Sequence, residues 1–201
     1  LADHGDGMGS HRMVTKQVSF YEEMTNVPFI IAGPGIHPRQ KPVEDLLTQP
    51  TIDLLPTLCE LAGIPVPSSK PGISLAPFLK GEKQKRQHPY AASEWHSEYE
   101  VTVSPGRMIR SPRYKYTHYL EGNGEELYDM LKDKGERRNL AHDPKYSKIL
   151  AEHRALLDDY IRRTQDDYRS LKVEADKRWR SHAPGYPNHE GPCARDIINR
   201  K

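Results

Sequence analysis

The stretch Val27-Pro28-Phe29-Ile30-Ile31-Ala32-Gly33-Pro34-Gly35 decides the fold class of this chain. Its first six residues form a nearly continuous apolar run, and the glycines and proline that follow are typical of a turn. A short run that is apolar on both faces suits a strand buried inside an α/β sheet. We therefore predict a buried strand over residues 27–32 and an α/β fold for the first part of the chain.

Helical patterns follow this predicted strand. Apolar residues recur at helical spacing through residues 51–62, and Pro56 is tolerated only near a helix start, so we place the N-cap near Asp53. Gly63 suits the position after a helix end, and the prolines beyond it prevent continuation. A further helical turn is expected over residues 75–79.

The second half of the chain changes its period. Short alternating segments predict strands over residues 90–95, 107–110, 114–120 and 126–130. Asp143-Pro144 then combines a helix cap with a proline at the first position, and predicts a long helix that ends between residues 167 and 171. An antiparallel sheet with one long helix is a small α+β subdomain.

The polar run at residues 81–87 is the best candidate for a boundary between the two halves. We therefore divide the chain into an α/β unit at 1–81, an α+β subdomain at 82–171 and an extended tail at 172–201.

Composition excludes several classes of function. The 201 residues carry a formal net charge of +2, with 29 % charged residues, and show no long basic stripe of the kind that a dedicated nucleic-acid binder needs. No apolar run approaches the length of a membrane span. Two cysteines do not specify a disulfide framework, so they leave the redox compartment open.

The first residues form a candidate metal and anion site. Asp3-His4 offers a carboxylate oxygen and an imidazole nitrogen, and Gly5 lets the chain bend so that both face one ion. Lys16 could hold an anion beside that ion. Taken alone, the triplet also fits an ordinary loop and Lys16 a solvated lysine. The glycines in this segment lack the spacing of a nucleotide-binding loop, and an EF-hand's alternating oxygen ligands are absent.

The order of motifs is more specific than any one of them. Over about residues 1–168 the chain resembles the C-terminal half of a type I, formylglycine-dependent sulfatase of the alkaline phosphatase superfamily. The resemblance rests on these segments: Asp3-His4-Gly5-Asp6, Gly9-x-His11, Lys16, Tyr21-Glu22-Glu23, the stretch at 27–35, Ile52-Asp53-Leu54-Leu55-Pro56-Thr57-Leu58, Gly72-Ile73-Ser74-Leu75, Arg107-Met108-Ile109-Arg110, Tyr114-Lys115-Tyr116, Glu126-Leu127-Tyr128-Asp129 and Arg138-Asn139-Leu140-Ala141.

This resemblance implies roles for particular residues. Asp3 and His4 would be two ligands of a divalent cation, usually calcium. Lys16 would bind the substrate sulfate and offset the charge that develops during S–O cleavage, and His11 would line the substrate pocket. Trp95, His96 and Arg107 would be further substrate contacts. The implied substrate is a sulfated sugar or glycan, and the implied location is periplasmic, extracellular or lysosomal.

The chain also departs from the family. The nucleophile of these enzymes is a formylglycine made from Cys or Ser in a Cys/Ser-x-Pro-x-Arg motif, and neither Cys59, Cys193 nor any serine begins that motif. The two N-terminal aspartates of the family's metal site are absent too. We therefore expect a C-terminal fragment that is inactive alone. Apolar surface around residues 27–31 and the helix from Thr51 would then favour self-association, or pairing with the missing N-terminal part that carries the formylglycine.

Two other functions remain open from the sequence. A phosphatase, phosphodiesterase or phosphomutase of the same superfamily also uses Asp-His-Gly metal ligands, although Lys16 and the later motifs favour a sulfatase. A non-catalytic sulfatase relative that binds a sulfated glycan or a partner chain would explain the missing nucleophile motif.

Overall fold

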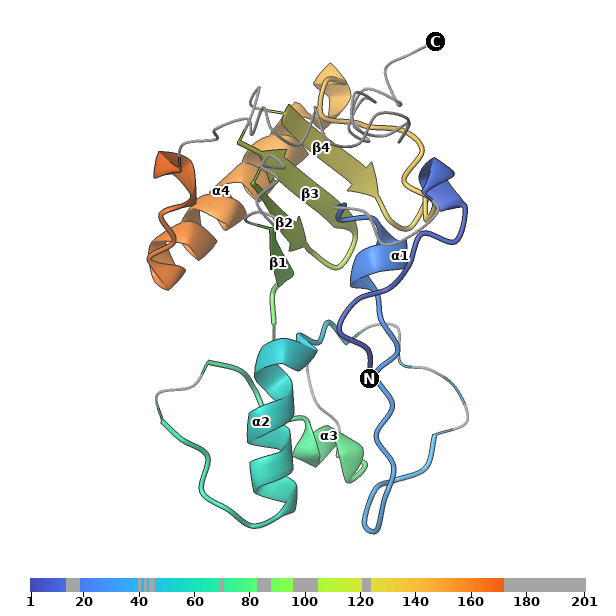
Figure 1. The fold of residues 1–201 in the computed structure, drawn as a ribbon, viewed down its shortest axis with the longest axis vertical. Coiled ribbons are helices and arrows are strands. Elements are labelled where there is room, and N and C mark those ends of the chain that lie inside the picture. The colour runs from blue at the N-terminus through green and yellow to red at the C-terminus, as the bar shows by residue number, and fades with distance from the viewer. Residues whose placement is uncertain are drawn as a thin grey trace, which may run out of the picture.

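A computed structural model describes residues 1–13, 19–39, 41, 43, 46–68, 71–82, 88–95, 105–120 and 124–171. Figure 1 shows a sheet crossed by a long helix in the upper part and shorter helices joined by long loops in the lower part. The elements are η1 (Ser10–Arg12), α1 (Glu22–Thr25), α2 (Pro50–Leu61), α3 (Ala76–Leu79), β1 (Ala91–Trp95), β2 (Gly106–Arg110), β3 (Tyr114–Tyr119), β4 (Gly124–Asp129), η3 (Pro144–Tyr146), α4 (Ser147–Thr164) and η4 (Tyr168–Ser170).

The four strands form one antiparallel sheet in the order β1-β2-β3-β4, which confirms the strands expected from alternation. Ile109 pairs with Tyr116, and Tyr116 pairs with Leu127 across the three central strands. These three side chains point to the same face, where α4 contacts β2 and β3 and supplies the buried Leu150 and Leu157. This face holds the larger of the two hydrophobic cores.

The opposite face of the sheet is covered by the first residues of the chain. Met13, Tyr21 and Met24 form a second buried cluster with Tyr128 and Met130 of β4 and its following turn. Figure 1 shows α1 lying beside the sheet, far in sequence from the strands that it touches. Met13 and the segment at 20–25 therefore lie against the second half of the chain, although the boundaries of the predicted units stay a prediction.

The strand predicted over residues 27–32 is wrong. The segment is extended, but it forms no strand ladder with any other segment that the structure describes. Ile30 in its middle is 80 % exposed, so the apolar run faces open space instead of a core. Apolar residues favour an extended backbone locally, whereas a strand also needs a neighbouring chain to hydrogen-bond with.

Helix α2 begins earlier than predicted. Pro50 occupies the first helical position after Gln49, and Pro56 lies inside the helix. Asp53 is therefore not the N-cap. Its fully buried carboxylate accepts hydrogen bonds from the backbone N–H groups of Gln49 (2.8 Å) and Ile73 (2.9 Å). The predicted helix end is confirmed, since Gly63 follows it with a φ of 68°.

The long helix begins as predicted and ends sooner. The Asp143 side chain accepts a hydrogen bond from the Lys145 N–H at the start of η3, and α4 continues from there. It ends at Thr164, because Gln165 adopts a left-handed conformation with a φ of 55°. The predicted tail at 172–201 lies outside the described residues. Among the helices that the structure describes, none is long and apolar enough to cross a membrane.

Candidate functional site

Asp3 and His4 lie side by side on an exposed loop. The His4 Nε2 and Asp3 Oδ2 atoms are 3.5 Å apart, and the two side chains are 43 % and 89 % exposed. The His4 Nδ1 atom is 2.8 Å from the Gly5 carbonyl oxygen, which can only accept a hydrogen bond. Nδ1 therefore carries the proton, and a neutral His4 presents the lone pair of Nε2. This is the tautomer that a metal-binding histidine needs.

The pair fits part of a cation site. Two ligand atoms that bind one calcium ion at about 2.4 Å and at a right angle lie roughly 3.4 Å apart. The observed separation of 3.5 Å is close to this value. Calcium takes about six to eight ligands, mostly oxygens, so Asp3 and His4 supply only a corner of such a site.

The position of this loop depends on Gly5. Its backbone N–H donates a hydrogen bond of 2.9 Å to the Met24 carbonyl of α1. A Cβ atom at Gly5 would lie 1.7 Å from the Glu23 carbonyl oxygen, so only glycine allows this approach. The Asp3–His4 pair is thereby held against α1.

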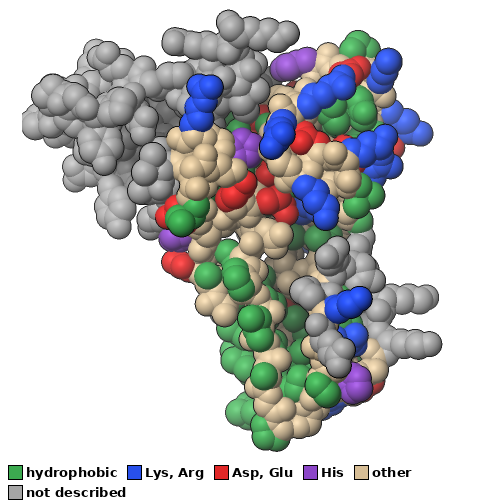
Figure 2. Space-filling view, turned by 90° about the vertical axis from the view of Figure 1, so that its right-hand side faces the viewer, with side chains coloured by type: hydrophobic (Ala, Val, Ile, Leu, Met, Phe, Trp, Pro, Cys, Tyr) green, Lys and Arg blue, Asp and Glu red, His purple; other side chains and the backbone are tan. Residues whose placement is uncertain are grey.

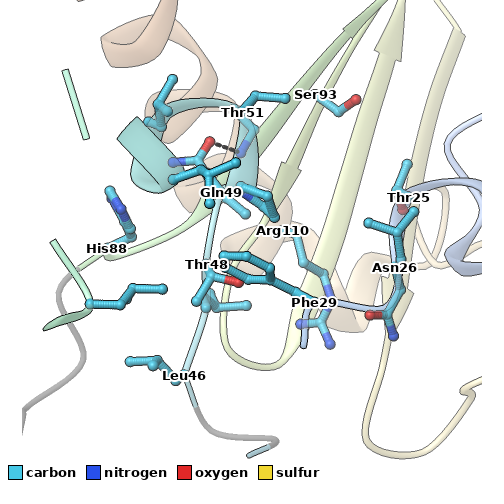
Figure 3. A pocket seen from close by; sticks show the side chains of 18 of the residues that line it. Thr25, Asn26, Phe29, Leu46, Thr48, Gln49, Thr51, His88, Ser93 and Arg110 are labelled. Carbon is cyan, nitrogen blue, oxygen red and sulfur yellow. Dashed lines mark hydrogen bonds between the residues drawn. The ribbon is translucent and has the colours of Figure 1, made fainter. Parts of the chain in front are cut away.

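Asp3 and His4 border a wide, open hollow between the upper and lower parts of the molecule. Its wall also includes the extended 26–33 segment, one side of α2 and strand β1. Figure 3 shows Asn26, Phe29 and Arg110 on one side of it and Gln49 and His88 on another. Figure 2 shows hydrophobic side chains gathered on the lower part of the molecule and charged side chains gathered above. The hollow is therefore a mainly apolar surface with the predicted ligands at its rim.

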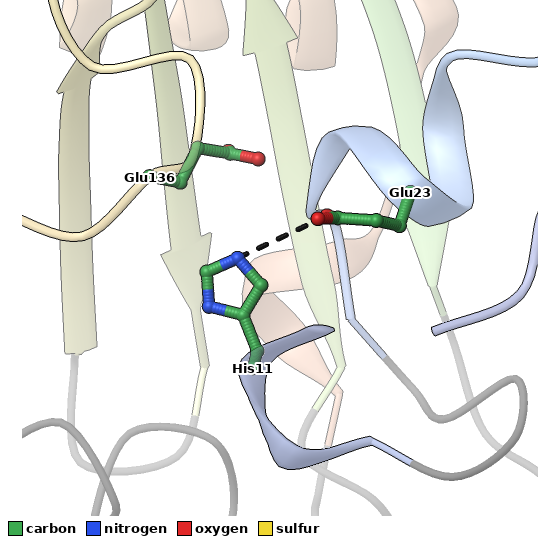
Figure 4. Close-up of side chains that lie close together, drawn as sticks. All are labelled: His11, Glu23 and Glu136. Carbon is green, nitrogen blue, oxygen red and sulfur yellow. Dashed lines mark ion pairs between the residues drawn. The ribbon is translucent and has the colours of Figure 1, made fainter. Parts of the chain in front are cut away.

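His11 lies elsewhere, on the side of the sheet opposite α4. Its ring stacks on Tyr21 with centroids 3.7 Å apart, and its Nε2 atom is 3.8 Å from the Glu23 Oε2 atom. The Glu136 side chain lies close to both His11 and Glu23, as Figure 4 shows. Burial lowers the pKa of His11. His11 is not among the residues that line the hollow, so its place in the substrate pocket stays a prediction.

The group formed by His11, Glu23 and Glu136 has the donor types of a metal site, but it already contains a cation. The Lys115 ammonium lies 2.9 Å from the Glu136 Oε1 atom, and both side chains are only 1 % exposed. A buried ammonium neutralises this carboxylate and repels a second cation. We therefore interpret the group as an ion-pair network.

Comparison with known proteins identifies the family. A sequence profile described as "N-sulphoglucosamine sulphohydrolase, C-terminal" matches residues 9–163. The chain belongs to this sulfatase family. It is 77 % identical over all 201 residues to the Delta 4,5-hexuronate-2-O-sulfatase of Bacteroides thetaiotaomicron, and covers 42 % of that protein.

Solved structures agree with this assignment. A structure described as a 2-O GAG sulfatase matches 98 % of the chain with a TM-score of 0.86 and 78 % identity, and the match covers 42 % of that structure. A phosphonate monoester hydrolase from Silicibacter pomeroyi matches 85 % of the chain with a TM-score of 0.66 and 26 % identity, over 35 % of its own length. The chain thus has the fold of a sulfatase C-terminal region, and spans about two fifths of the length of the two sulfatases named above.

Only two of the four remaining predicted site residues, Trp95 and Arg107, lie in the part of the chain that the structure describes. Lys16 and His96 lie outside the described residues of this sulfatase chain. Trp95 borders the hollow, which is compatible with substrate contact. Arg107 is only 3 % exposed, and its guanidinium donates hydrogen bonds of 2.6 and 2.9 Å to the Asp166 carboxylate. Because this side chain is buried and paired, its predicted role as a substrate contact is wrong.

Sequence reasoning missed the buried charges of this sulfatase domain. Lys115 lies between Tyr114 and Tyr116 in a strand, and simple alternation places a lysine there on a solvated face. The structure buries it against Phe20 and Glu22. The sequence held one signal, the acidic pair in Tyr21-Glu22-Glu23, because a buried lysine requires a carboxylate as a partner.

Proposed function

We propose that this chain is part of a sulfatase that hydrolyses sulfate esters of sulfated glycans, with a 2-O-sulfated hexuronate as the substrate unit. One observation carries the proposal: the chain is 77 % identical, along its whole length, to a protein named Delta 4,5-hexuronate-2-O-sulfatase. Identity at this level along the whole chain supports a shared reaction as well as a shared fold.

In this proposal, Asp3 and His4 hold a divalent cation, with calcium as the expected ion. The cation supplies positive charge beside the substrate's sulfate. Asp3 contributes a carboxylate oxygen, and His4 contributes Nε2 while its Nδ1–H remains bonded to the Gly5 carbonyl. Lys16 places a further positive charge on the sulfate, which stabilises the transition state as negative charge shifts to the leaving oxygen.

The nucleophile comes from outside these 201 residues. No Cys/Ser-x-Pro-x-Arg motif occurs in the chain, so we place the formylglycine in a preceding part of the whole protein. That part also supplies the remaining cation ligands and covers the hollow that Asp3 and His4 border. We expect the whole protein to act in the periplasm, a lysosome or the extracellular space, where sulfated glycans are met.

A phosphonate monoester hydrolase is the second candidate. Its structure matches most of the chain with a TM-score of 0.66 at 26 % identity. Sulfate and phosphonate monoesters are both tetrahedral oxyanions, so one cation and one lysine serve either reaction. The much higher identity to the 2-O-sulfatase favours sulfate esters.

The decisive experiment measures sulfate released by the full-length protein from an unsaturated disaccharide with a single 2-O-sulfate. The matched substrate carries its single sulfate on the 6-O position of the hexosamine, and a phosphonate monoester tests the second candidate. We expect release from the 2-O-sulfated substrate only, and at least a hundredfold loss in Lys16→Ala. Preferred cleavage of the phosphonate would refute the proposal. The 201-residue chain alone should release no sulfate.

A further inference from the structure

Lys115 is a buried cation that bonds to a distant part of the chain. It lies on β3, on the sheet face opposite α4, and is 1 % exposed. Its Nζ donates a hydrogen bond of 2.8 Å to the Phe20 carbonyl and forms a 2.7 Å ion pair with the Glu22 Oε1 atom. A lysine almost never becomes this buried unless it is paired. These two Lys115 contacts thus join β3 to the beginning of α1.

Glu136 closes the network from the loop after β4. Its Oε1 atom is 2.9 Å from the Lys115 Nζ, and its Oε2 accepts a 2.7 Å hydrogen bond from the Glu22 backbone N–H. Its backbone is left-handed, with a φ of 47°, a conformation that a glutamate keeps only when its surroundings hold it. One carboxylate therefore contacts both Lys115 and the first turn of α1. Figure 4 shows Glu136 pointing toward this helix.

Helix α1 passes this constraint on to the Asp3–His4 loop. The Met24 carbonyl of this helix accepts a hydrogen bond from the Gly5 N–H, and the Glu23 carbonyl lies against the Gly5 Cα. Gly5 in turn accepts the His4 Nδ1–H through its carbonyl. A four-residue helix is too short to hold its own position. The position of the ligand pair therefore depends on whatever anchors α1.

We propose that Lys115 and Glu136 are positioning residues for the Asp3–His4 cation site. Their buried ion pair fixes α1, and the bond between Gly5 and Met24 transmits that position to the two ligands. The inference rests on the proposed function, because it assumes that Asp3 and His4 bind a cation. It assigns a functional task to Lys115 of β3 and Glu136 of the loop after β4, neither of which is a proposed cation ligand.

A purely structural ion pair would have a different signature, and the chain offers a matched control. Arg107 is also buried on the sheet and paired with a carboxylate, but its partner Asp166 follows α4 and is not part of α1. Removing either cation takes the ion-pair partner from a largely buried carboxylate and destabilises the protein. Only the loss of Lys115 should also disturb the cation site.

The experiment compares Lys115→Met, Lys115→Arg and Glu22→Gln with Arg107→Met in the full-length protein. Calcium affinity is measured by calorimetry, thermal stability by scanning calorimetry, and backbone exchange at Gly5 by hydrogen–deuterium exchange. Glu22→Gln is the mild variant, since Glu22 is 23 % exposed and the amide keeps the side chain's shape. It remains informative if Lys115→Met does not fold.

We expect Lys115→Met to weaken calcium binding about tenfold or more, the usual effect of removing a residue that orients a ligand. Glu22→Gln should weaken it less, and Lys115→Arg should restore part of it. Gly5 exchange should quicken in the same order, while Arg107→Met lowers stability with normal calcium affinity and Gly5 exchange.

Two results would overturn the inference: unchanged Gly5 exchange in the Lys115 and Glu22 variants, or equal calcium loss in Arg107→Met. If the wild-type protein binds no calcium, the proposed cation site fails, whereas the exchange at Gly5 still decides whether Lys115 positions the loop.

Discussion

Replacing Gly5 by alanine should disable the site without touching a ligand. A Cβ atom there would lie 1.7 Å from the Glu23 carbonyl oxygen and 2.8 Å from its carbon, where ordinary contacts begin at 3.4 Å. Both obstacles are backbone atoms, so no side-chain rotation relieves them. The loop must move away from α1 by more than 1 Å, and the bond between the Gly5 N–H and the Met24 carbonyl breaks.

The expected magnitude follows from that displacement. Forcing a group into a filled site costs about 1–3 kcal/mol, and losing the hydrogen bond adds about 1 kcal/mol. A ligand pair displaced by about 1 Å lowers a catalytic rate roughly a hundredfold. We therefore expect Gly5→Ala in the full-length protein to reduce kcat/KM for the 2-O-sulfated disaccharide about a hundredfold and to weaken calcium binding.

Gly33→Ala is the matched control. A Cβ atom there meets nothing within 4 Å, and the residue lies on an exposed turn. This variant should keep wild-type kinetics within about twofold. Sulfate release and calcium titration are measured for both variants under the same conditions. Equal kinetics in Gly5→Ala and Gly33→Ala would contradict this prediction, because the loop would then not need to lie against α1.

Three further predictions address the rest of the molecule. Asp53→Ala should destabilise the lower part by about 3–5 kcal/mol, because it leaves His88 and two backbone N–H groups without their buried acceptor; chemical denaturation against exposed Thr51→Ala tests this, and equal midpoints would contradict it. In the isolated 201-residue chain, Ile30→Ser with Leu58→Ser should reduce self-association in light scattering, since these side chains are 80 % and 50 % exposed beside the hollow, whereas Met8→Ser, 85 % exposed outside it, should not. Burial lowers the pKa of His153 in the folded protein. As the pH falls below about 6.5, this histidine therefore takes up a proton first in the unfolded protein, and the folded state loses stability. His153→Gln should flatten the fall in melting temperature between about pH 7 and 5, and an unchanged slope would exclude His153 as its cause.

The sequence predicted those parts of the fold that depend on neighbouring residues. The alternation around Tyr116 and the cap at Asp143 act within a few residues, and β3 and the start of the long helix follow them. The strand predicted over residues 27–32 was wrong because a strand needs a neighbouring strand to hydrogen-bond with, and no local pattern contains that information. Pro56 led to a helix start that is too late, because the helix accommodates a proline in its interior: the Ile52 carbonyl loses its usual helical N–H partner there, and Gly72 packs against it.

The candidate site was likewise predictable only where it depends on neighbouring residues. Asp3-His4-Gly5 could be found from the sequence, because adjacent ligands followed by a glycine are a local feature. The support beneath it was invisible, since residues 22, 115 and 136 meet only in the folded chain. The prediction for Arg107 failed in the opposite direction: the resemblance to the sulfatase family implied a substrate contact, and the fold instead buries this residue against Asp166.

Calcium titration of the full-length protein is the most direct test of the Asp3–His4 cation site. Wild-type protein, Asp3→Asn and His4→Ala are compared with Asp6→Asn, which removes a charge from the same exposed loop at a residue whose side chain accepts a hydrogen bond from the Met8 N–H. We expect one calcium ion per chain in wild type and Asp6→Asn, and binding weakened at least tenfold in Asp3→Asn and His4→Ala. Wild-type calcium affinity in Asp3→Asn and His4→Ala would contradict this expectation.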